Sequence, residues 1–412
     1  MRCCVFDIIK RPFYLENIFK FVDKPIIKII TGMRRSGKSS ILKMIIEEIS
    51  VNNPKIKVIY INKESLRFDF IKDYKDLYKY VSEKSKDSNF KYYIFIDEIQ
   101  EISEWEKAVS SFLTDNTGDL FLTGSNAHLL SSELSTLITG RYIEINVLPL
   151  GFTEFLDFRK KNSKNINIDI EFENYLQYGG LPGIHHMEFE KEVIYQYLNS
   201  LFDSILLKDV ISRNNIRNVS VLKSITKFIF DNCGNLTTAK NISDFLKSQR
   251  INITVDTVQN YLSYLEEAFL VFSAKRYDIK GKRYLEFFSK YYMGDIGLRN
   301  GFVGYRNEDI SGLLENVVYL ELIRCGYVVS IGKKEELEVD FIAEKNGIKV
   351  YIQVCYMLNT KEVIEREFSV LEQISDNYPK FVISMDKINK VNRNGVFTIN
   401  LLDFCLNKKF LD

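Results

Sequence analysis

Short apolar runs alternate with amphipathic stretches over the first 150 residues of the chain. Residues 92–96 (YYIFI) are continuously apolar, which is typical of a strand buried on both faces of a parallel sheet. Strands are expected at 26–30, 57–61, 92–96, 120–122 and 142–147, with helices between them that include 73–84 and 104–113. The alternation of strands and helices predicts an α/β domain, in which a parallel sheet is flanked by helices.

The pattern of apolar and polar positions changes twice further along the chain. Residues 190–215 have one apolar helical face, and the region after them combines helices with later strands. Helices are expected at 220–230, 239–246, 255–268, 311–324 and 361–375, and strands at 270–275, 283–288, 327–331, 338–343, 349–354, 380–384 and 396–400. We therefore expect four regions: an α/β domain over 1–150, a helical lid or linker over 151–215, a winged helix-turn-helix over 216–300 and a second α/β domain over 301–412.

The loop after the first predicted strand carries the most specific motif. Gly32, Gly37, Lys38 and Ser39 fill every fixed position of G-x-x-x-x-G-K-[ST], and the residues after Ser39 have a helical pattern. Backbone N–H groups of such a loop close around phosphates, a Lys reaches the β- and γ-phosphates, and a Ser hydroxyl ligates Mg²⁺. The motif predicts ATP and Mg²⁺ as cofactors, with candidate nucleotide contacts at Gly32, Arg34, Arg35, Ser36, Gly37, Lys38, Ser39 and Ser40.

Two acidic residues follow the third predicted strand. Asp97 and Glu98 come where that strand ends, beside the phosphate loop of an open α/β sheet. We expect Asp97 to hold Mg²⁺ through water together with Ser39, and Glu98 to polarise the attacking water. The alternative is a solvated acidic turn. The pair of motifs indicates an ATP hydrolase with Lys38 and Glu98 as catalytic residues.

Two further polar residues are candidates for the same site. Ser125 follows the fourth predicted strand, where its hydroxyl can contact the γ-phosphate or the water, or can simply satisfy a turn. Arg141 opens the fifth strand and is either an arginine finger acting in a neighbouring subunit or a member of a surface ion pair. The first alternative for Arg141 requires a homo-oligomer.

Composition narrows the choice of partners and compartment. The chain has 412 residues, 46% hydrophobic and 27% charged, with a net charge of +1, so any nucleic-acid surface must be a local patch. No apolar run approaches the length of a transmembrane span, and the N-terminal segment is a poor signal peptide. Six scattered cysteines without a C-x-x-C pair indicate reduced thiols. We expect a cytoplasmic protein that is not bound to a membrane.

The motifs together resemble the prokaryotic AAA-type ATPases, close to the archaeal-ATPase and STAND groups. The stretches that carry the resemblance are ITGMRRSGKSS, FIDEIQ, LTGSNAHLL, LITGRYIEINVLPLGFTEFL and YGGLPGI. The resemblance implies that Gly180-Leu181-Pro182 is a Gly-x-Pro element that senses nucleotide through Pro182, although a loop breaking two helices is the plainer interpretation. It also implies that Arg11 and Tyr14 lie in a segment that contacts adenine.

The predicted winged helix-turn-helix offers a candidate surface for double-stranded DNA. Its third helix carries polar side chains that can meet base edges, and its wing carries five cations and one acid. The alternative is a structural winged helix with a solvated basic turn. The candidate contacts are Thr257, Gln259, Asn260, Lys275, Arg276, Lys280, Lys282 and Arg283.

The order of elements after residue 300 is similar to the PD-(D/E)XK nuclease core, a restriction-endonuclease-like α/β fold. Glu315 matches its helix acid and Asp340 its first strand acid. The acid-x-Lys pair that should follow is replaced by Gln353 and Cys355, which removes a metal-binding charge and an ammonium. We therefore expect a nuclease-like fold that does not cut, with plain surface acids as the alternative for Glu315 and Asp340.

Three functional hypotheses follow from these motifs. The first is an ATP-hydrolysing switch or motor that couples its nucleotide state to DNA or protein binding through the C-terminal domains. The second is a signalling or regulatory scaffold, in which bound ATP or ADP gates partner binding with little turnover. The third, a metal-dependent nuclease, depends on Glu315 and Asp340.

Overall fold

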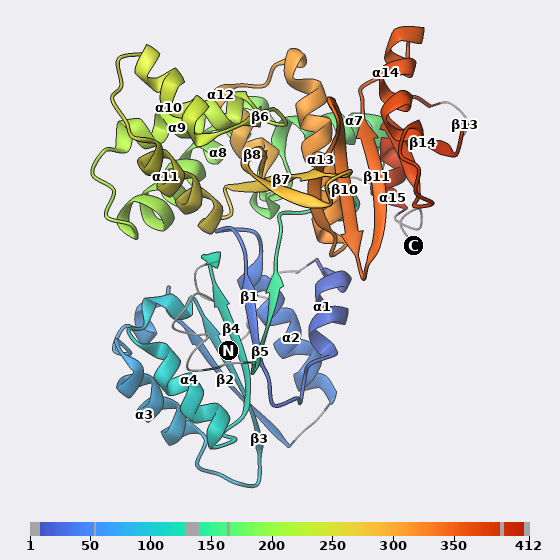
Figure 1. The fold of residues 1–412 in the computed structure, drawn as a ribbon. Coiled ribbons are helices and arrows are strands. Elements are labelled where there is room, and N and C mark those ends of the chain that lie inside the picture. The colour runs from blue at the N-terminus through green and yellow to red at the C-terminus, as the bar shows by residue number, and fades with distance from the viewer. Residues whose placement is uncertain are drawn as a thin grey trace. The chain divides into compact units, whose positions relative to one another are not determined.

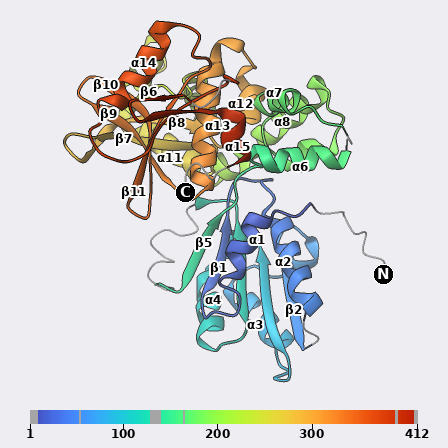
Figure 2. The ribbon, with the colours of Figure 1, turned by 90° about the vertical axis from the view of Figure 1, so that its right-hand side faces the viewer.

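The computed structural model describes residues 9–52, 55–127, 138, 140–162, 165–387 and 391–407. The chain forms two units, one of Met1–Val147 with Glu267–Phe269 and one of Leu148–Glu266 with Leu270–Asp412 (Figure 1; Figure 2). The finer predicted divisions inside the second unit stay predictions.

The first unit contains a five-stranded sheet in the order β2-β3-β4-β1-β5, and its registered strand pairs are all parallel. Its strands are β1 (Ile27–Thr31), β2 (Ile56–Asn62), β3 (Lys91–Asp97), β4 (Asp119–Gly124) and β5 (Tyr142–Asn146). Its helices are α1 (Pro12–Phe19), α2 (Lys38–Asn52), α3 (Tyr74–Lys84) and α4 (Trp105–Thr114), with single turns η1 (Leu66–Phe68) and η2 (Ile99–Glu101). The prediction of a parallel sheet flanked by helices is confirmed.

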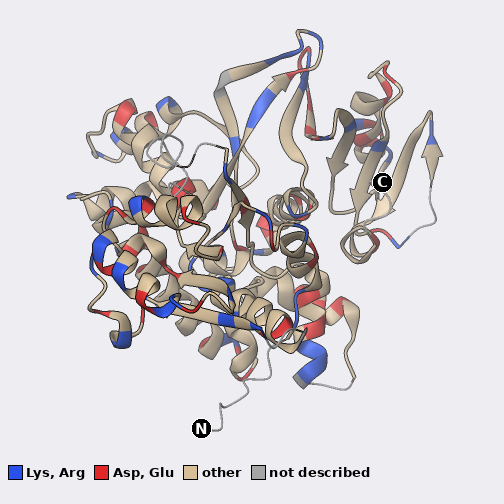
Figure 3. Ribbon diagram, turned by 90° about the horizontal axis from the view of Figure 1, so that it is seen from below, with Lys and Arg blue, Asp and Glu red and all other residues tan. Residues whose placement is uncertain are grey.

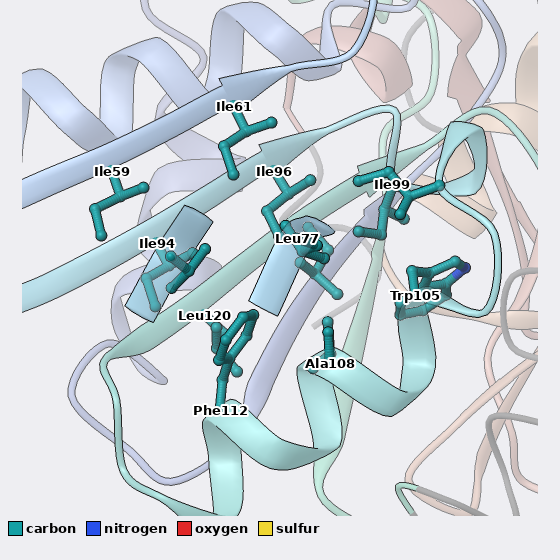
Figure 4. Close-up of a cluster of buried hydrophobic side chains, with 14 of the residues drawn as sticks. Ile59, Ile61, Leu77, Ile94, Ile96, Ile99, Trp105, Ala108, Phe112 and Leu120 are labelled. Atoms are coloured by element: carbon teal, nitrogen blue, oxygen red, sulfur yellow. The ribbon is translucent and has the colours of Figure 1, made fainter. Parts of the chain in front are cut away.

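Helices cover both faces of this sheet, and the side chains of β3 show why. Ile94 and Ile96 pack in one buried cluster with residues of α3 and α4, including Leu77 and Phe112 (Figure 4). Tyr93 and Phe95, which alternate with these two residues along the strand, belong to a second cluster, formed with α1 and α2. Successive strand residues point to opposite faces, so a continuous apolar run supplies two cores at once.

The parallel pairing also brings the functional residues to one edge of the sheet. Thr31 pairs with Gly124, and Asn62 pairs with Asp97, so the carboxyl ends of β1, β2, β3 and β4 lie side by side. In open α/β sheets this is the edge where ligands bind. The loop that joins β1 to α2 lies there.

The second unit contains a nine-stranded sheet in the order β13-β14-β12-β11-β10-β9-β7-β8-β6. Its strands are β6 (Leu236–Thr237), β7 (Val271–Asp278), β8 (Arg283–Met293), β9 (Val328–Lys334), β10 (Leu337–Lys345), β11 (Ile348–Val354), β12 (Lys380–Ser384), β13 (Asn392–Arg393) and β14 (Val396–Asn400). Its α-helices are α6 (Phe152–Asn162), α7 (Ile168–Tyr178), α8 (Lys191–Ile205), α9 (Val219–Asp231), α10 (Ala239–Ser248), α11 (Val255–Glu267), α12 (Ile296–Val303), α13 (Ile310–Arg324), α14 (Lys361–Glu372) and α15 (Leu401–Leu406). Shorter helical segments are η4 (Pro182–His186), η5 (Leu206–Ser212) and η6 (Asn307–Asp309).

One sheet therefore runs through the two regions predicted at 216–300 and 301–412. Strand β7 pairs with β8 on one side and, in parallel, with β9 on the other, where Arg276 lies opposite Ile331. The predicted boundary at residue 300 falls inside helix α12. The edge of the β7–β8 hairpin is thus covered by the next region of the chain, which protects it from pairing with other molecules.

The turn of this hairpin is shorter than the sequence predicts. We expected the first strand to end near Lys275, whereas β7 continues to Asp278 after a register shift between Lys275 and Arg276. Asp278 accepts hydrogen bonds from the backbone N–H groups of Lys280 and Gly281, and these close the turn.

Among the described residues, no helix is long and apolar enough to cross a membrane.

Candidate functional sites

The loop between β1 and α2 has the backbone of a phosphate cradle. Gly32 adopts φ +140°, and a Cβ added there would lie 2.3 Å from the carbonyl oxygen of Val147. Gly37 adopts φ +105°. Only glycine takes these conformations readily, and at Gly32 any side chain would also collide with the neighbouring backbone. The glycines of the motif are therefore required by the fold of the loop.

Lys38 lies across this cradle and is 4% exposed. Its Nζ donates hydrogen bonds to the carbonyl oxygens of Gly32 at 2.9 Å and Met33 at 3.0 Å, and it lies 4.0 Å from a carboxylate oxygen of Glu98. Neutral carbonyls orient the ammonium without cancelling its charge. The arrangement fits an anionic ligand placed over the loop.

Ser36 supplies a separate indication that the loop is shaped for a ligand. Its side chain is fully buried, and its Oγ has no hydrogen-bond partner among the described residues. A buried hydroxyl left unpaired costs about 1–3 kcal/mol, so a phosphate oxygen that accepts its hydrogen would recover that free energy. The carbonyl oxygen of the same residue accepts a hydrogen bond of 3.0 Å from the guanidinium of Arg11.

Arg11 and Tyr14 thus lie against the loop. Arg11 is 2% exposed, and its guanidinium lies 4.5 Å from the centre of the Tyr14 ring. The contact with Ser36 shows that this segment supports the backbone of the phosphate loop. The contact with adenine that the resemblance implies stays a prediction.

Asp97 is the centre of a buried hydrogen-bond network. Its Oδ1 accepts hydrogen bonds from Ser39 Oγ at 3.1 Å and Thr123 Oγ1 at 2.5 Å, and its Oδ2 accepts one from the Tyr60 hydroxyl at 3.0 Å. Burial, and after it the Asp97 carboxylate, raises the pKa of Tyr60 above its ordinary value. A hydroxyl and a carboxylate at this separation provide the oxygen donors that Mg²⁺ prefers, so the residues present fit that ion.

Glu98 sits immediately beyond this network in a left-handed conformation, with φ +58°. Its N–H donates to Thr123 Oγ1 at 3.0 Å, and its carboxylate accepts a hydrogen bond from Gln100 Nε2. The same Nε2 lies 3.4 Å from Ser125 Oγ. Gln100 therefore connects the candidate catalytic Glu98 with the candidate sensor Ser125, a link that sequence reasoning missed.

The remaining residues predicted to contact or sense the nucleotide lie at separate positions in the structure. Arg34 pairs with Glu64 at 3.3 Å, Arg35 is exposed, and Ser40 lies in the first turn of α2. Arg141 is exposed, and its carbonyl oxygen accepts a hydrogen bond from Ile27 N at 2.9 Å. Pro182 begins η4 in the second unit. The stretches LTGSNAHLL and LITGRYIEINVLPLGFTEFL fall partly outside the described residues, at 128–137 and 139.

The candidate DNA contacts belong to α11 and the β7–β8 hairpin. Gln259 and Lys275 line one cavity of about 620 Å³, which also touches α10. Thr257 is half-buried and shares a 2.8 Å hydrogen bond with Thr254, whereas Asn260 is exposed. Of the hairpin cations, Arg276 is half-buried, and Lys275, Lys280, Lys282 and Arg283 are exposed.

The four nuclease-like positions line a different cavity, of about 480 Å³. Asp340 is 8% exposed and accepts a hydrogen bond of 2.9 Å from Val354 N, so the alternative of a plain surface acid is wrong for Asp340. Gln353 accepts a hydrogen bond from Asp340 N at 2.6 Å and donates one to Glu367 at 3.0 Å. Burial raises the pKa of Cys355 to about 12. Glu315 is largely enclosed at the same cavity.

Comparisons with known proteins agree with the fold of the first unit. A family model described as an AAA domain matches residues 24–156, and a domain of unknown function (DUF8612) matches residues 169–309. An uncharacterized protein of Haemophilus influenzae is 38% identical over 403 residues, which cover 97% of this chain and 99% of that protein. The uncharacterized protein MJ1544 of Methanocaldococcus jannaschii is 33% identical over 363 residues, covering 84% and 78%. The chain belongs to the family of these two proteins.

Among solved structures, this AAA-domain protein is similar to the Walker-type ATPase PABY2304 of Pyrococcus abyssi. The TM-score is 0.52 at 15% sequence identity, with 72% of this chain and 95% of that chain covered. At this identity the likeness shows the fold alone. Together with the AAA-domain match, it supports the prediction of an AAA-type P-loop ATPase fold.

Proposed function

We propose that this AAA-domain protein is an Mg²⁺-dependent ATPase whose nucleotide state controls binding of double-stranded DNA by its second unit. One observation carries the hydrolytic part. Ser39, Asp97 and Thr123 form a hydrogen-bonded chain, and Thr123 also accepts a hydrogen bond from the backbone N–H of Glu98. The hydroxyl and carboxylate that fit Mg²⁺ are thereby held next to the carboxylate that would polarise water.

Each residue has a stated task in this proposal. Lys38 neutralises charge on the β- and γ-phosphates, Ser39 and Asp97 hold Mg²⁺, and Glu98 orients the attacking water. Mg²⁺, when bound, supplies charge neutralisation across the phosphates. Ser125 reports the state of the γ-phosphate to Glu98 through Gln100.

The DNA-binding part depends on exposed polar and cationic side chains. Gln259 and Asn260 face solvent on α11, and Lys275, Lys282 and Arg283 face solvent on the hairpin. Lys280 is paired with Glu335 at 3.2 Å, and this pair lowers its availability for phosphates. The net charge is +1, and Figure 3 shows cationic and acidic segments interspersed along the ribbon, so contact must come from this local group.

The deciding experiment is steady-state ATP hydrolysis by the full chain, with and without double-stranded DNA, beside Lys38→Ala as the inactive control. We expect Mg²⁺-dependent turnover that DNA increases and that Lys38→Ala removes. A matched variant, Lys282→Ala with Arg283→Ala, should keep the basal rate and lose the DNA response. DNA-independent turnover of normal size would remove the DNA part of the proposal and direct the search to protein partners.

A gated scaffold with little turnover is a second candidate, and the contact between Gln100 and Glu98 favours it. A carboxylate already bound by a side-chain amide is less available to a water molecule. Gln100→Ala should raise the ATPase rate if this contact restrains Glu98. A rate near zero in both proteins, with nucleotide still tightly bound, would favour the scaffold.

A further inference from the structure

Three acids that line the cavity around Asp340 contact an ammonium group that the sequence pattern did not predict. Lys290 comes from β8 and is 3% exposed. Its Nζ lies 2.9 Å from Glu338 Oε1, 3.1 Å from Glu315 Oε2 and 3.3 Å from Asp340 Oδ1. Three carboxylates thus converge on one cation.

These carboxylates come from two elements that the fold brings to one point. Glu338 and Asp340 are two residues apart on β10, so their side chains leave the same face of the strand. Glu315 projects from helix α13, and its Oε2 also accepts a hydrogen bond of 3.1 Å from Tyr292. A lysine ammonium has three N–H donors, which is one for each carboxylate.

The cluster carries more negative than positive charge. Glu336 and Glu367 also line the cavity, and Glu367 is paired with Arg366 at 2.6 Å, whereas Lys290 contacts Glu315, Glu338 and Asp340. Burial lowers the pKa of Lys290, whereas the charges of Asp340, Glu315 and Glu338 raise it. The charges outweigh burial, so the pKa of Lys290 lies above its ordinary value. Burial and the Asp340 charge raise the pKa of Glu315 to about 8, against the opposing effect of Lys290.

We propose that the Lys290 ammonium is a built-in replacement for a divalent cation, and that its removal turns the Glu315–Glu338–Asp340 cluster into a divalent-cation site. Hard oxygen ligands converging on one point are the ligands that Mg²⁺ and Mn²⁺ select. In the native chain the ammonium occupies that point. Within the described ranges, no group of three or more His, Cys, Asp or Glu residues has the arrangement to hold a metal ion as the chain stands.

This proposal is independent of the proposed ATPase function. It also gives a physical reason why the cavity would not perform metal-assisted phosphodiester cleavage in the native chain. A divalent ion entering the cluster would have to displace a buried ammonium or accept its repulsion at close range. The wild-type protein should therefore bind divalent cations at this cluster weakly.

The test is a titration of nucleotide-free protein with Mn²⁺ alone, following free Mn²⁺ by electron paramagnetic resonance. All proteins carry Asp97→Asn, so that the nucleotide site does not contribute a second ion. Lys290→Met keeps the aliphatic stem and removes the charge. We expect it to bind one Mn²⁺ at least about tenfold more tightly than its parent, a difference of 1.4 kcal/mol.

Adding Asp340→Asn to Lys290→Met should abolish the gained Mn²⁺ binding, since it removes one of the three ligands. Tight Mn²⁺ binding by the parent, which needs no folded Lys290 variant, would overturn the proposal. A folded Lys290→Met protein that binds Mn²⁺ no better than its parent would also overturn it. If Lys290→Met does not fold, Lys290→Gln places an uncharged amide among the three acids without removing any of them, and its Mn²⁺ affinity decides the same question.

Discussion

Two buried lysines in this protein lie in opposite surroundings. Lys38 in the first unit donates hydrogen bonds to the neutral carbonyl oxygens of Gly32 and Met33, and the carboxylate of Glu98 lies farther away, at 4.0 Å. Lys290 in the second unit is held by the carboxylates of Glu315, Glu338 and Asp340. Carbonyls orient a charge and leave it to act on a ligand, whereas carboxylates neutralise it. In our proposals the same side chain thus serves an anion site in one unit and occupies a cation position in the other.

The largest effect that tests this contrast is on turnover. Glu98→Gln keeps the shape of the side chain and removes the carboxylate that we propose polarises water, so the ATPase rate should fall by about 10²–10⁴-fold. Binding of ATP, measured by filter retention of labelled nucleotide, should stay close to the wild-type value. Undiminished hydrolysis would show that Glu98 is not the water-polarising residue.

The second effect is on folding stability. Lys290→Met leaves the carboxylates of Glu338 and Asp340, and the Glu315 carboxyl, without their cation, and breaking a buried ion pair in this way costs about 3–5 kcal/mol of unfolding free energy. Glu338→Gln, at the more exposed edge of the cluster, should cost about 1 kcal/mol or less. Urea unfolding of the two variants measures both values. Equal losses would mean that Lys290 is not the centre of the cluster.

A smaller effect concerns pH. The pKa of Glu315 is raised to about 8 by burial and by Asp340, so the folded protein holds this proton where the unfolded chain, near 4.5, has lost it. Stability is therefore greatest below the unfolded pKa and decreases as pH rises toward 8, by less than about 1.4 kcal/mol per pH unit. Urea midpoints between pH 5 and pH 8 should show this slope. Glu315→Gln should flatten it, while a slope unchanged in that variant would assign the effect elsewhere.

The smallest effect is expected at the phosphate loop. Ser36→Ala removes a buried hydroxyl without a partner, so the nucleotide-free protein should become slightly more stable. If a phosphate oxygen is the missing partner, ATP affinity should fall by about 1 kcal/mol, roughly fivefold. Thermal unfolding with and without ATP separates the two changes. Loss of stability in the absence of ATP would contradict the interpretation of Ser36.

The sequence predicts the first unit well because its motifs are local. The phosphate loop lies within eight residues, and Asp97 and Glu98 directly follow a continuous apolar strand. Thr123 and Tyr60 escaped prediction because their hydrogen bonds to Asp97 form only when β2, β3 and β4 pair in parallel. Nothing in the spacing of those residues indicates that contact.

The second unit shows the limit of sequence reasoning more clearly. The elements around Asp340 were predicted closely, but Lys290 lies 50 residues away on a strand assigned to another region. Its approach depends on the pairing of β7 with β9, which joins the two regions in one sheet. Cys355 occupies the position where the motif would have a lysine, directly after β11, so the sequence offers no ammonium there. Only the sheet order reveals that another strand supplies an ammonium.

The position of Lys290 on β8 also has a consequence for the pairing register of that strand. Successive side chains of a strand alternate between faces, so a slip of β8 by one residue would turn Lys290 away from its three acids and point Ser289 or Tyr291 at them. The contacts of the ammonium therefore favour one register of the hairpin. A misaligned hairpin is therefore penalised electrostatically once α13 and β10 bring these acids to it.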